Sequence, residues 1–292
     1  MNVKRVLSIL CASIISLGLI GCGSSNLDNS TKGESGEEVV VATSVAVTEI
    51  LDALGVEVAG IPSTSYELPE STKDAVEVGN PMSPDLEIIK SLNPSIVVSV
   101  DTLGSDYISL FEENNIPSEF VSLTSLEGLK ETIKKLGERF SKEDKAAEIL
   151  AELELKEEEV SNIENENKPN IMVIFAAPGS TMLATPSSYI GNLVELVGGN
   201  NIIQDSNSSF VTYNKEELSK LNPDKILVMV HAMPEETKAA LEKEMSSDTT
   251  WQSIQAVKDG NVVYLDNTYF GMSANLKSIE GLDILSDIVH NN

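Results

Sequence analysis

Histidine is scarce in this sequence, so each of its two histidines can be weighed as a metal or ligand contact. His231 directly follows the apolar run Ile226–Val230, which its β-branched residues predict to be a buried strand. Ligands bind at the carboxyl ends of strands in open α/β sheets, so this position makes His231 a candidate ligand. A capped or solvent-facing loop histidine would fit the same pattern. His290 lies three residues from the end of the chain, where fraying into solvent is expected.

A second candidate lies in the loop Val78-Gly79-Asn80-Pro81-Met82-Ser83-Pro84-Asp85, which contains two prolines and a glycine. Met82 could either pack beneath this rigid loop or act as a soft metal ligand. We expect Ser83 to cap the helix that follows, with Pro84 at its first position. Histidine and methionine together form an axial pair for haem iron in cytochromes c.

Composition and motifs argue against several other kinds of chemistry. The chain has 46 acidic and 20 basic residues and a net charge of −26, which is unsuited to neutralising nucleic-acid phosphates. No Gly-x-Ser-x-Gly, His-Glu-x-x-His or Gly-rich phosphate loop is present. The acids are too numerous for any pair to stand out as a catalytic dyad, so the sequence does not support an enzyme.

The first residues have the features of a secretion signal. Lys4 and Arg5 precede the uninterrupted apolar run Val6–Ile20, which is short for a membrane span, although an uncleaved anchor is the alternative. The run ends in Leu19-Ile20-Gly21-Cys22, which resembles the lipobox of bacterial lipoproteins. This resemblance implies a signal peptide over residues 1–21, a lipid on Cys22 and a flexible linker over residues 22–38. Cys11 would be removed with the signal.

The rest of the chain alternates short apolar runs with helical patterns, which predicts an α/β protein with largely parallel sheets. The expected strands are Val39–Ala42, Ser95–Val100, Glu119–Leu123, Ile171–Ala176, Ile226–Val230 and Asn261–Leu265. The expected helices are Ala46–Leu54, Pro84–Leu92, Asp106–Asn114, Leu126–Phe140, Ser188–Val197, Lys215–Leu221, Pro234–Met245 and Ser278–His290.

One long helix is expected near the middle of the chain. Residues 142–167 contain no Gly or Pro and many Glu, which predicts a largely exposed helix with a narrow apolar stripe. We expect it to join an N-terminal α/β lobe over residues 39–141 to a C-terminal α/β lobe over residues 168–292. A ligand site would then lie in the cleft between the lobes.

The two expected lobes contain similar segments. Glu87 precedes Asn93-Pro94 by 93 − 87 = 6 residues, and Glu216 precedes Asn222-Pro223 by 222 − 216 = 6 residues. Both segments predict a helix, a proline stop and a buried strand, with the residue before each proline extended. Two further helices are expected to end at Gly55 and Gly198. These echoes favour two similar lobes over one large sheet.

Across nearly the whole mature chain, the sequence resembles the haem-binding lipoproteins of the iron-regulated surface determinant systems of Gram-positive bacteria. More broadly it resembles the substrate-binding proteins of haem, siderophore and vitamin B12 ABC importers. The stretches that carry the resemblance are Pro62–Tyr66, Val78–Asp85, Pro178–Ser180, Ser188–Gly191, His231–Glu236 and Phe270–Leu276.

The resemblance implies a bilobed fold of the periplasmic-binding-protein type, with two lobes joined by one long helix and haem held between them. It implies Met82 and His231 as the axial iron ligands, with Tyr66, Phe270 and Met272 lining the porphyrin. Glu87 and Glu216 match acidic residues that dock onto arginines of the membrane permease in related proteins. Ordinary solvated helix glutamates are the alternative for those two positions.

One position departs from the family pattern. Glu67 follows Tyr66 where a basic residue near a haem propionate is expected. Backbone amides at the Thr43-Ser44 turn, at the start of a helix, are a candidate replacement.

The resemblance also implies partners and a location. We expect a lipid-anchored monomer on the outer face of a Gram-positive-like cell membrane. It would receive haem, for which upstream surface haem-relay proteins are a candidate source, and pass it to an ABC permease and its ATPase. A ferric-siderophore or corrinoid binder of the same fold is one alternative, and a surface haem-modifying enzyme is another.

Overall fold

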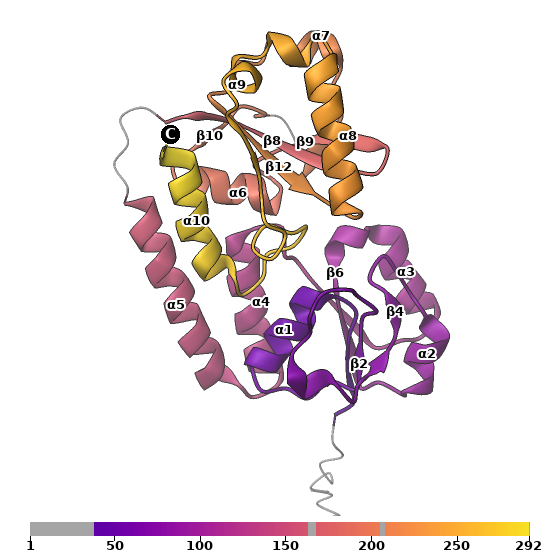
Figure 1. Cartoon of the computed structure of the whole chain (residues 1–292). Coiled ribbons are helices and arrows are strands. Elements are labelled where there is room, and N and C mark those ends of the chain that lie inside the picture. The colour runs from indigo at the N-terminus through magenta and orange to yellow at the C-terminus, as the bar shows by residue number, and fades with distance from the viewer. Residues whose placement is uncertain (1–37, 163–167, 205–207, 292) are drawn as a thin grey trace, which may run out of the picture. The chain divides into compact units, whose positions relative to one another are not determined.

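The computed structural model describes residues 38–162, 168–204 and 208–291 of the chain. The predicted signal peptide over residues 1–21, Cys22 and residues 23–37 of the linker lie outside the described residues, as do residues 163–167. Residues from Glu37 onward form one compact unit, coloured from indigo to yellow in Figure 1. Within the described ranges, none of the helices combines the length and the apolar character that crossing a membrane requires.

The N-terminal lobe is built on a five-stranded sheet in the order β3-β2-β1-β6-β7, with every neighbouring pair parallel. Its strands are β1 (Val40–Ala42), β2 (Gly60–Ile61), β3 (Val76–Glu77), β6 (Ile96–Val100) and β7 (Ser118–Val121). A separate antiparallel hairpin contains β4 (Gly79–Asn80) and β5 (Ser83–Pro84). The helices are α1 (Val45–Ala53), α2 (Leu86–Ser91), α3 (Ser105–Glu113) and α4 (Leu126–Arg139), with short 3₁₀ turns at Glu70–Thr72 and Asp101–Leu103.

The C-terminal lobe has a mixed sheet in the order β11-β9-β8-β12-β13, with β10 beside the start of β8. Its strands are β8 (Asn170–Ala177), β9 (Ser180–Ala184), β10 (Asn200–Asn201), β11 (Phe210–Val211), β12 (Lys225–Val230) and β13 (Val262–Tyr264). Its helices are α6 (Tyr189–Leu196), α7 (Lys215–Leu218), α8 (Pro234–Ser247), α9 (Gln255–Lys258) and α10 (Ser278–His290), with a 3₁₀ turn at Trp251–Ser253.

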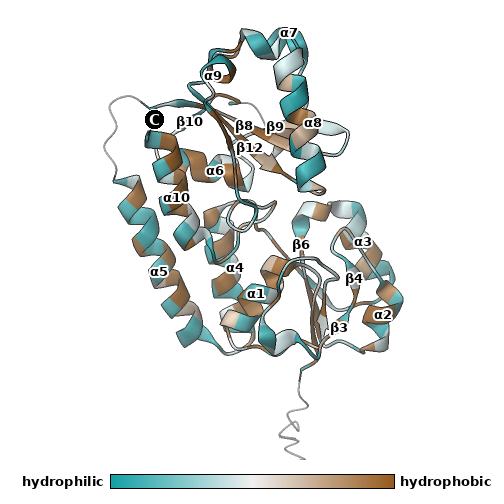
Figure 2. Ribbon diagram, in the orientation of Figure 1, coloured by the Kyte–Doolittle hydropathy of each residue, from teal (hydrophilic) through white to brown (hydrophobic). Residues whose placement is uncertain are grey.

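Helix α5 (Glu143–Ser161) connects the two lobes along the chain. It packs against α4 of the N-terminal lobe and α10 of the C-terminal lobe, beside both of them in Figure 1. Lys156 of α5 lies 2.9 Å from Asp283 of α10, and Lys130 of α4 lies 2.9 Å from Glu157 of α5. Figure 2 shows α5 as largely hydrophilic with a few apolar residues, in agreement with the predicted narrow stripe.

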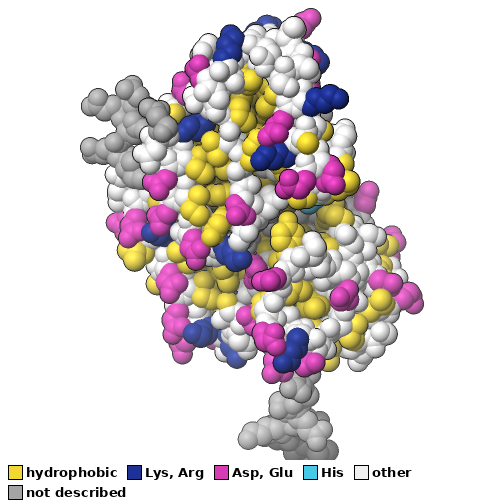
Figure 3. All heavy atoms as spheres, viewed as in Figure 1, with side chains coloured by type: hydrophobic (Ala, Val, Ile, Leu, Met, Phe, Trp, Pro, Cys, Tyr) yellow, Lys and Arg dark blue, Asp and Glu magenta, His cyan; other side chains and the backbone are white. Residues whose placement is uncertain are grey.

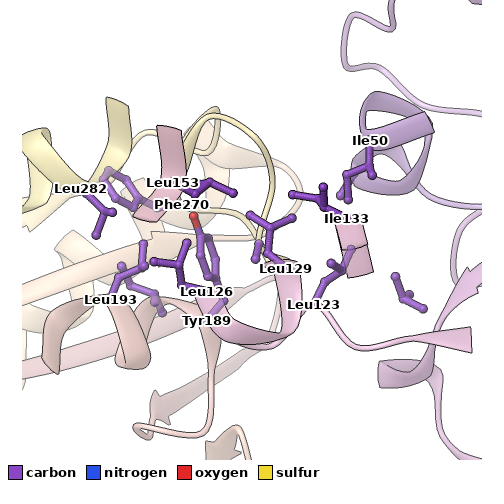
Figure 4. Close-up of a cluster of buried hydrophobic side chains, with 14 of the residues drawn as sticks. Ile50, Leu123, Leu126, Leu129, Ile133, Leu153, Tyr189, Leu193, Phe270 and Leu282 are labelled. Carbon is purple, nitrogen blue, oxygen red and sulfur yellow. The ribbon is translucent and has the colours of Figure 1, made fainter. Parts of the chain in front are cut away.

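A single hydrophobic cluster runs through both lobes. It contains Ile133 of α4, Leu153 of α5, Leu193 of α6 and Leu282 of α10, all fully buried. Figure 4 shows Leu153 and Leu282 near Phe270, and Ile133 farther along the same cluster, near Ile50. Asn192 of α6 also accepts a hydrogen bond from the backbone of Leu126 at the start of α4, at 3.0 Å. Because apolar packing and a helix cap both join the lobes, a large hinge motion would expose core.

Helices α4 and α6 begin in the same way, one in each lobe. Ser125 and Ser188 cap them, and each accepts a hydrogen bond from the glycine three residues on, Gly128 at 3.0 Å and Gly191 at 3.1 Å. A Cβ on either glycine would meet the carbonyl oxygen six residues earlier, at 2.6 Å for Gly128 and 1.9 Å for Gly191. This shared start adds a third echo to the two that the sequence predicts.

The structure confirms the α/β class, the two similar lobes and the six expected strands. Gly55 and Gly198 end α1 and α6 with φ of 70° and 83°, as the helix-closing role requires.

Several local predictions are wrong. Asp85, and not Ser83, caps α2, so Pro84 lies before the helix. Asn93 adopts φ of 50° and is not extended, a conformation that asparagine tolerates better than other residues. His290 does not fray, because its Nε2 lies 2.5 Å from the carbonyl oxygen of Val197.

Both sheets also contain strands that the sequence did not predict. The hairpin partner β9 and the short strands β2, β3, β10 and β11 were not predicted from the sequence. The antiparallel β8–β9 pair turns at Pro178-Gly179, where Gly179 has φ of 73°. Strands of two residues carry too little alternation to be distinguished from loops.

Candidate functional site

A pocket of about 460 Å³ lies between the two lobes. Helix α1 and two loops of the N-terminal lobe form one wall, and the end of β12 with the segment before α10 forms the other. The residues that line it are Ser44, Val45, Ala46, Glu49, Ser65, Tyr66, Glu67, Pro81, Met229, Val230, His231, Asn267, Thr268, Gly271, Met272, Ser273, Asn275 and Lys277. Its size falls within the range of small-molecule sites.

His231 lies in this wall, one residue beyond β12. Its backbone N–H donates to the carbonyl of Ala176 at 2.7 Å, which extends the β12–β8 ladder and fixes where the side chain starts. The imidazole stacks on Phe175, with ring centroids 5.8 Å apart and planes at 28°. This stacking orients the ring without using either ring nitrogen.

The electrostatic surroundings of His231 favour the neutral imidazole. The residue is exposed to solvent, yet the protein packed around part of the ring lowers the pKa of His231 below its ordinary value through desolvation. Neutral imidazole is the form that binds metals.

The backbone after His231 is strained. Ala232 and Met233 adopt φ of 63° and 44°, in the left-handed region that costs free energy for residues with a side chain. Thr237 donates its hydroxyl to the Ala232 carbonyl at 3.0 Å, and Pro234 starts α8 directly afterwards. These contacts hold the sharp turn that follows His231 at the carboxyl end of β12.

Met82 occupies the tip of the β4–β5 hairpin. Asn80 pairs with Ser83 across the hairpin, and the Asn80 side chain accepts a hydrogen bond from the Met82 N–H at 2.9 Å. The Met82 side chain is 70% exposed, so the alternative that it packs beneath its loop is wrong. Its neighbour Pro81 lines the pocket, whereas Met82 itself lies outside the wall.

The remaining pocket candidates fall into two groups. Ser44, Tyr66 and Met272 line the pocket, and Ser44 also caps α1 by accepting from the Val47 N–H at 3.3 Å. Thr43 and Phe270 lie behind the wall, at 2% and 0% exposure.

Both of these buried residues have structural contacts. The Thr43 hydroxyl donates to Ser99 at 2.7 Å, and Phe270 packs in the core that the lobes share. In this structure they support the wall, and the residues beside them form its surface.

Two charged wall residues, Glu49 and Lys277, were missed by reasoning from the sequence. Glu49 faces the pocket from α1, and burial raises its pKa while the charge of Lys277 opposes that rise. The stretch Phe270–Leu276 that carries the family resemblance ends one residue before Lys277. The resemblance places Met272 of this segment at the ligand, and the fold shows that Lys277 reaches the pocket as well.

Glu87 and Glu216 occupy matching positions on the two lobes. Asp85 caps α2 and Asn214 caps α7, so each glutamate lies two residues after its cap, 87 − 85 = 2 and 216 − 214 = 2. Both are exposed, and Glu87 lies 3.4 Å from Lys90. The equal spacing that the sequence shows is therefore also an equal place in the fold.

A second cavity, of about 440 Å³, lies wholly within the C-terminal lobe between the β8–β9 turn and α8. Its lining includes Glu236 and Glu244 but no histidine, lysine or arginine. No group of three His, Cys, Asp or Glu side chains that could hold a bare metal ion occurs in the part of the chain that the structure describes. The pocket between the lobes is therefore the stronger candidate site.

Comparison with known proteins decides the family. The sequence profile of the periplasmic binding protein family matches residues 40–269. The chain belongs to the periplasmic binding protein family. This family assignment agrees with the two lobes and the pocket between them.

Individual relatives of this periplasmic binding protein are similar over nearly their whole length. It is 34% identical, over 99% of both chains, to the high-affinity heme uptake system protein IsdE of Staphylococcus aureus strain Newman. The crystal structure of S. aureus IsdE complexed with heme matches with a TM-score of 0.84 and 33% identity, covering 88% of this chain and 100% of that one. An ABC transporter substrate-binding protein from Listeria monocytogenes EGD-e matches with a TM-score of 0.83 and 37% identity, with the same coverage of 88% and 100%.

Proposed function

We propose that this periplasmic binding protein captures haem between its lobes and delivers it to an ABC permease for iron acquisition. The observation that carries the proposal is the position of His231, a solvent-accessible imidazole with a lowered pKa in the wall of the pocket between the lobes. The full-length similarity to a haem uptake protein supports it.

Iron would be bound from both lobes. His231 supplies a nitrogen ligand from the C-terminal lobe, and Met82 supplies a thioether from the hairpin of the N-terminal lobe. Met82 is 70% exposed, so its thioether sulfur is accessible to a ligand from solvent. Two protein ligands leave iron no open position for oxygen, which favours carriage over reaction.

The direct test is an absorbance titration of the purified chain, residues 23–292, with haemin. We expect a low-spin His/Met spectrum in the parent, loss of it in His231→Ala and weakened binding in Met82→Ala. Added imidazole should restore a low-spin spectrum to His231→Ala if only the ligand is missing.

The control is Leu155→Ala, because Leu155 is also exposed, at 60%, but lies on α5, away from both proposed ligands. Parent-like binding in both ligand variants would disprove the ligand assignment.

Permease docking through Glu87 and Glu216 is the second part of the proposal. Their matching places at the starts of α2 and α7 present one carboxylate on each lobe. Two arginines of a permease could each pair with one of these carboxylates. The Glu87→Ala/Glu216→Ala variant should lower haem uptake by cells and leave haemin affinity unchanged.

The control for docking is Glu113→Ala/Glu242→Ala, which removes the same charge from exposed positions on α3 and α8. Equal loss of uptake in both double variants would contradict a specific role of Glu87 and Glu216 and would indicate a general effect of surface charge.

Attachment to the outer face of the membrane would come from Cys22, after removal of residues 1–21. In that case Cys22→Ser should shift the protein from the membrane fraction to the culture medium. We also propose that the protein acts as a monomer and not as an enzyme. Haem recovered after incubation with a reductant and oxygen should be chemically intact, and accumulation of a cleaved tetrapyrrole would contradict this.

A ferric-siderophore or corrinoid ligand is the alternative on the same fold. Such ligands would need several basic or aromatic wall residues, whereas the described wall has one aromatic residue, Tyr66, and one basic residue, Lys277. Competition of haemin binding by a ferric catecholate at equal concentration would favour the alternative.

A further inference from the structure

The pocket between the lobes contains an uneven distribution of charge. Its ionisable wall residues are Glu49, Glu67, His231 and Lys277, together with the Tyr66 phenol. Lys277 is the one lysine or arginine among the wall residues that the structure describes. Figure 3 shows that acidic side chains outnumber basic ones on the face in view, consistent with the net charge of −26. Among the charged side chains of this wall, Glu49 and Glu67 would repel an anionic ligand and Lys277 would attract it.

The backbone of Lys277 is held on both sides. On one side, the Ala274 N–H donates to the Leu123 carbonyl of the N-terminal lobe at 2.8 Å. On the other side, the Ser278 hydroxyl lies 2.7 Å from the Tyr189 hydroxyl, and Ser278 is fully buried. The Lys277 N–H also donates to the Asn275 side chain at 2.9 Å. The lysine therefore projects from a fixed point at the junction of the lobes.

The Lys277 ammonium group is not used within the described fold. No carboxylate lies within 4.0 Å of its Nζ in the described ranges, although several other lysines of the same chain form such pairs. Its charge nevertheless acts on Glu49 of α1 and on Asp266, lowering the pKa of each relative to what their other surroundings impose. The ammonium group therefore lies near the pocket and is able to pair with a further carboxylate.

The opposite wall adds a second source of positive potential. Val45 and Ala46, the first two residues of α1, line the same pocket, and the positive end of this nine-residue helix faces that wall. By contrast, Glu67 would repel a carboxylate in the loop where the family pattern has a base. This chain has a cation at the pocket, Lys277, but it lies on the C-terminal lobe and not in that loop.

We propose that Lys277 binds the carboxylates of the ligand and so selects tetrapyrroles with free propionates. This inference rests on the proposed function. It implies that the propionate edge of haem enters the pocket against the turn before α10. Glu49 opposes it, because its carboxylate competes for the same ammonium group. Lys277 and Glu49 therefore set affinity in opposite directions.

The test compares haemin with haemin dimethyl ester, whose carboxylates are uncharged, on the parent and on Lys277→Met. Lys277→Met keeps the length of the side chain and removes its charge. We expect it to weaken haemin binding about tenfold, as for the loss of one solvent-accessible charged hydrogen bond, and to change ester binding less than about twofold. Glu49→Gln should strengthen haemin binding and likewise leave the ester unaffected.

Two controls separate this role from a structural one. Lys134→Met removes the same charge from an exposed position on α4 outside the pocket and should bind haemin as the parent does. The low-spin spectrum of Lys277→Met should match that of the parent, because the iron ligands are untouched. Equal loss for haemin and ester, or no loss for haemin, overturns the inference. Failure of the parent itself to bind haemin would instead overturn the proposed function.

Discussion

The start of helix α6 offers a quantitative test of the packing within the C-terminal lobe. A Cβ built on Gly191 would lie 1.9 Å from the carbonyl oxygen of Thr185 and 2.7 Å from its carbon. Carbon and oxygen approach to about 3.3 Å in ordinary contacts, so the carbonyl would have to retreat by more than about 1 Å. That oxygen accepts hydrogen bonds from the N–H and the hydroxyl of Ser188, at 3.0 and 2.7 Å, and both would break.

The expected cost of Gly191→Ala follows from these contacts. Two hydrogen bonds contribute about 1 kcal/mol each, and a forced overlap of this kind costs about 1–3 kcal/mol. Alanine recovers at most about 1 kcal/mol of helix propensity. The net loss is therefore about 2–4 kcal/mol of unfolding free energy, which corresponds to a fall in Tm of roughly 4–16 °C for a unit of this size.

The chain supplies a matched control within another helix. A Cβ on Gly281 of α10 would meet Tyr269 at 3.4 Å and Phe270 at 3.6 Å, which are ordinary contacts. Gly281→Ala should therefore keep or raise Tm by up to about 3 °C, since only the helix propensity changes. Thermal unfolding followed by circular dichroism measures both variants. A Tm for Gly191→Ala within about 2 °C of the parent, or an equal fall in both, would refute the reasoning.

Three further predictions follow from the burial and charge of other side chains. Desolvation lowers the pKa of His231, so haemin affinity should stay level as pH falls from 8 through about 6.5 and decline only below that; a decline already at pH 7.5 would contradict this. Burial raises the pKa of Glu49 in the folded state, so its ionisation removes stability as pH rises through that raised value. Glu49→Gln should therefore raise Tm at pH 7.5, by about 1–3 °C, and not at pH 4, with equal gains at both values counting against it. Leu153→Ala, at a fully buried position in the shared core, should cost about 2–5 kcal/mol in urea unfolding through one cooperative transition, and two separate transitions would argue against a shared core.

Much of the fold was predictable because its signals are local. Short β-branched runs predict the central strands, and the Gly stops mark the ends of α1 and α6. The repeated Glu-to-Asn-Pro spacing predicted matching lobes, and Glu87 and Glu216 indeed hold matching places after their caps. His231 was identified as a candidate because it follows a buried strand, and that position can be recognised from sequence order alone.

The sequence by itself determined the class of fold and the two lobes, and it named Met82 and His231 as candidate iron ligands. Tertiary structure decided which residues share the pocket: it exposes Met82, sets Thr43 and Phe270 behind the wall and brings Lys277 beside α1. These outcomes depend on contacts between segments far apart in the chain, such as Ala274 with Leu123. Hydrophobic periodicity specifies which face of an element is buried, but not which distant element covers it.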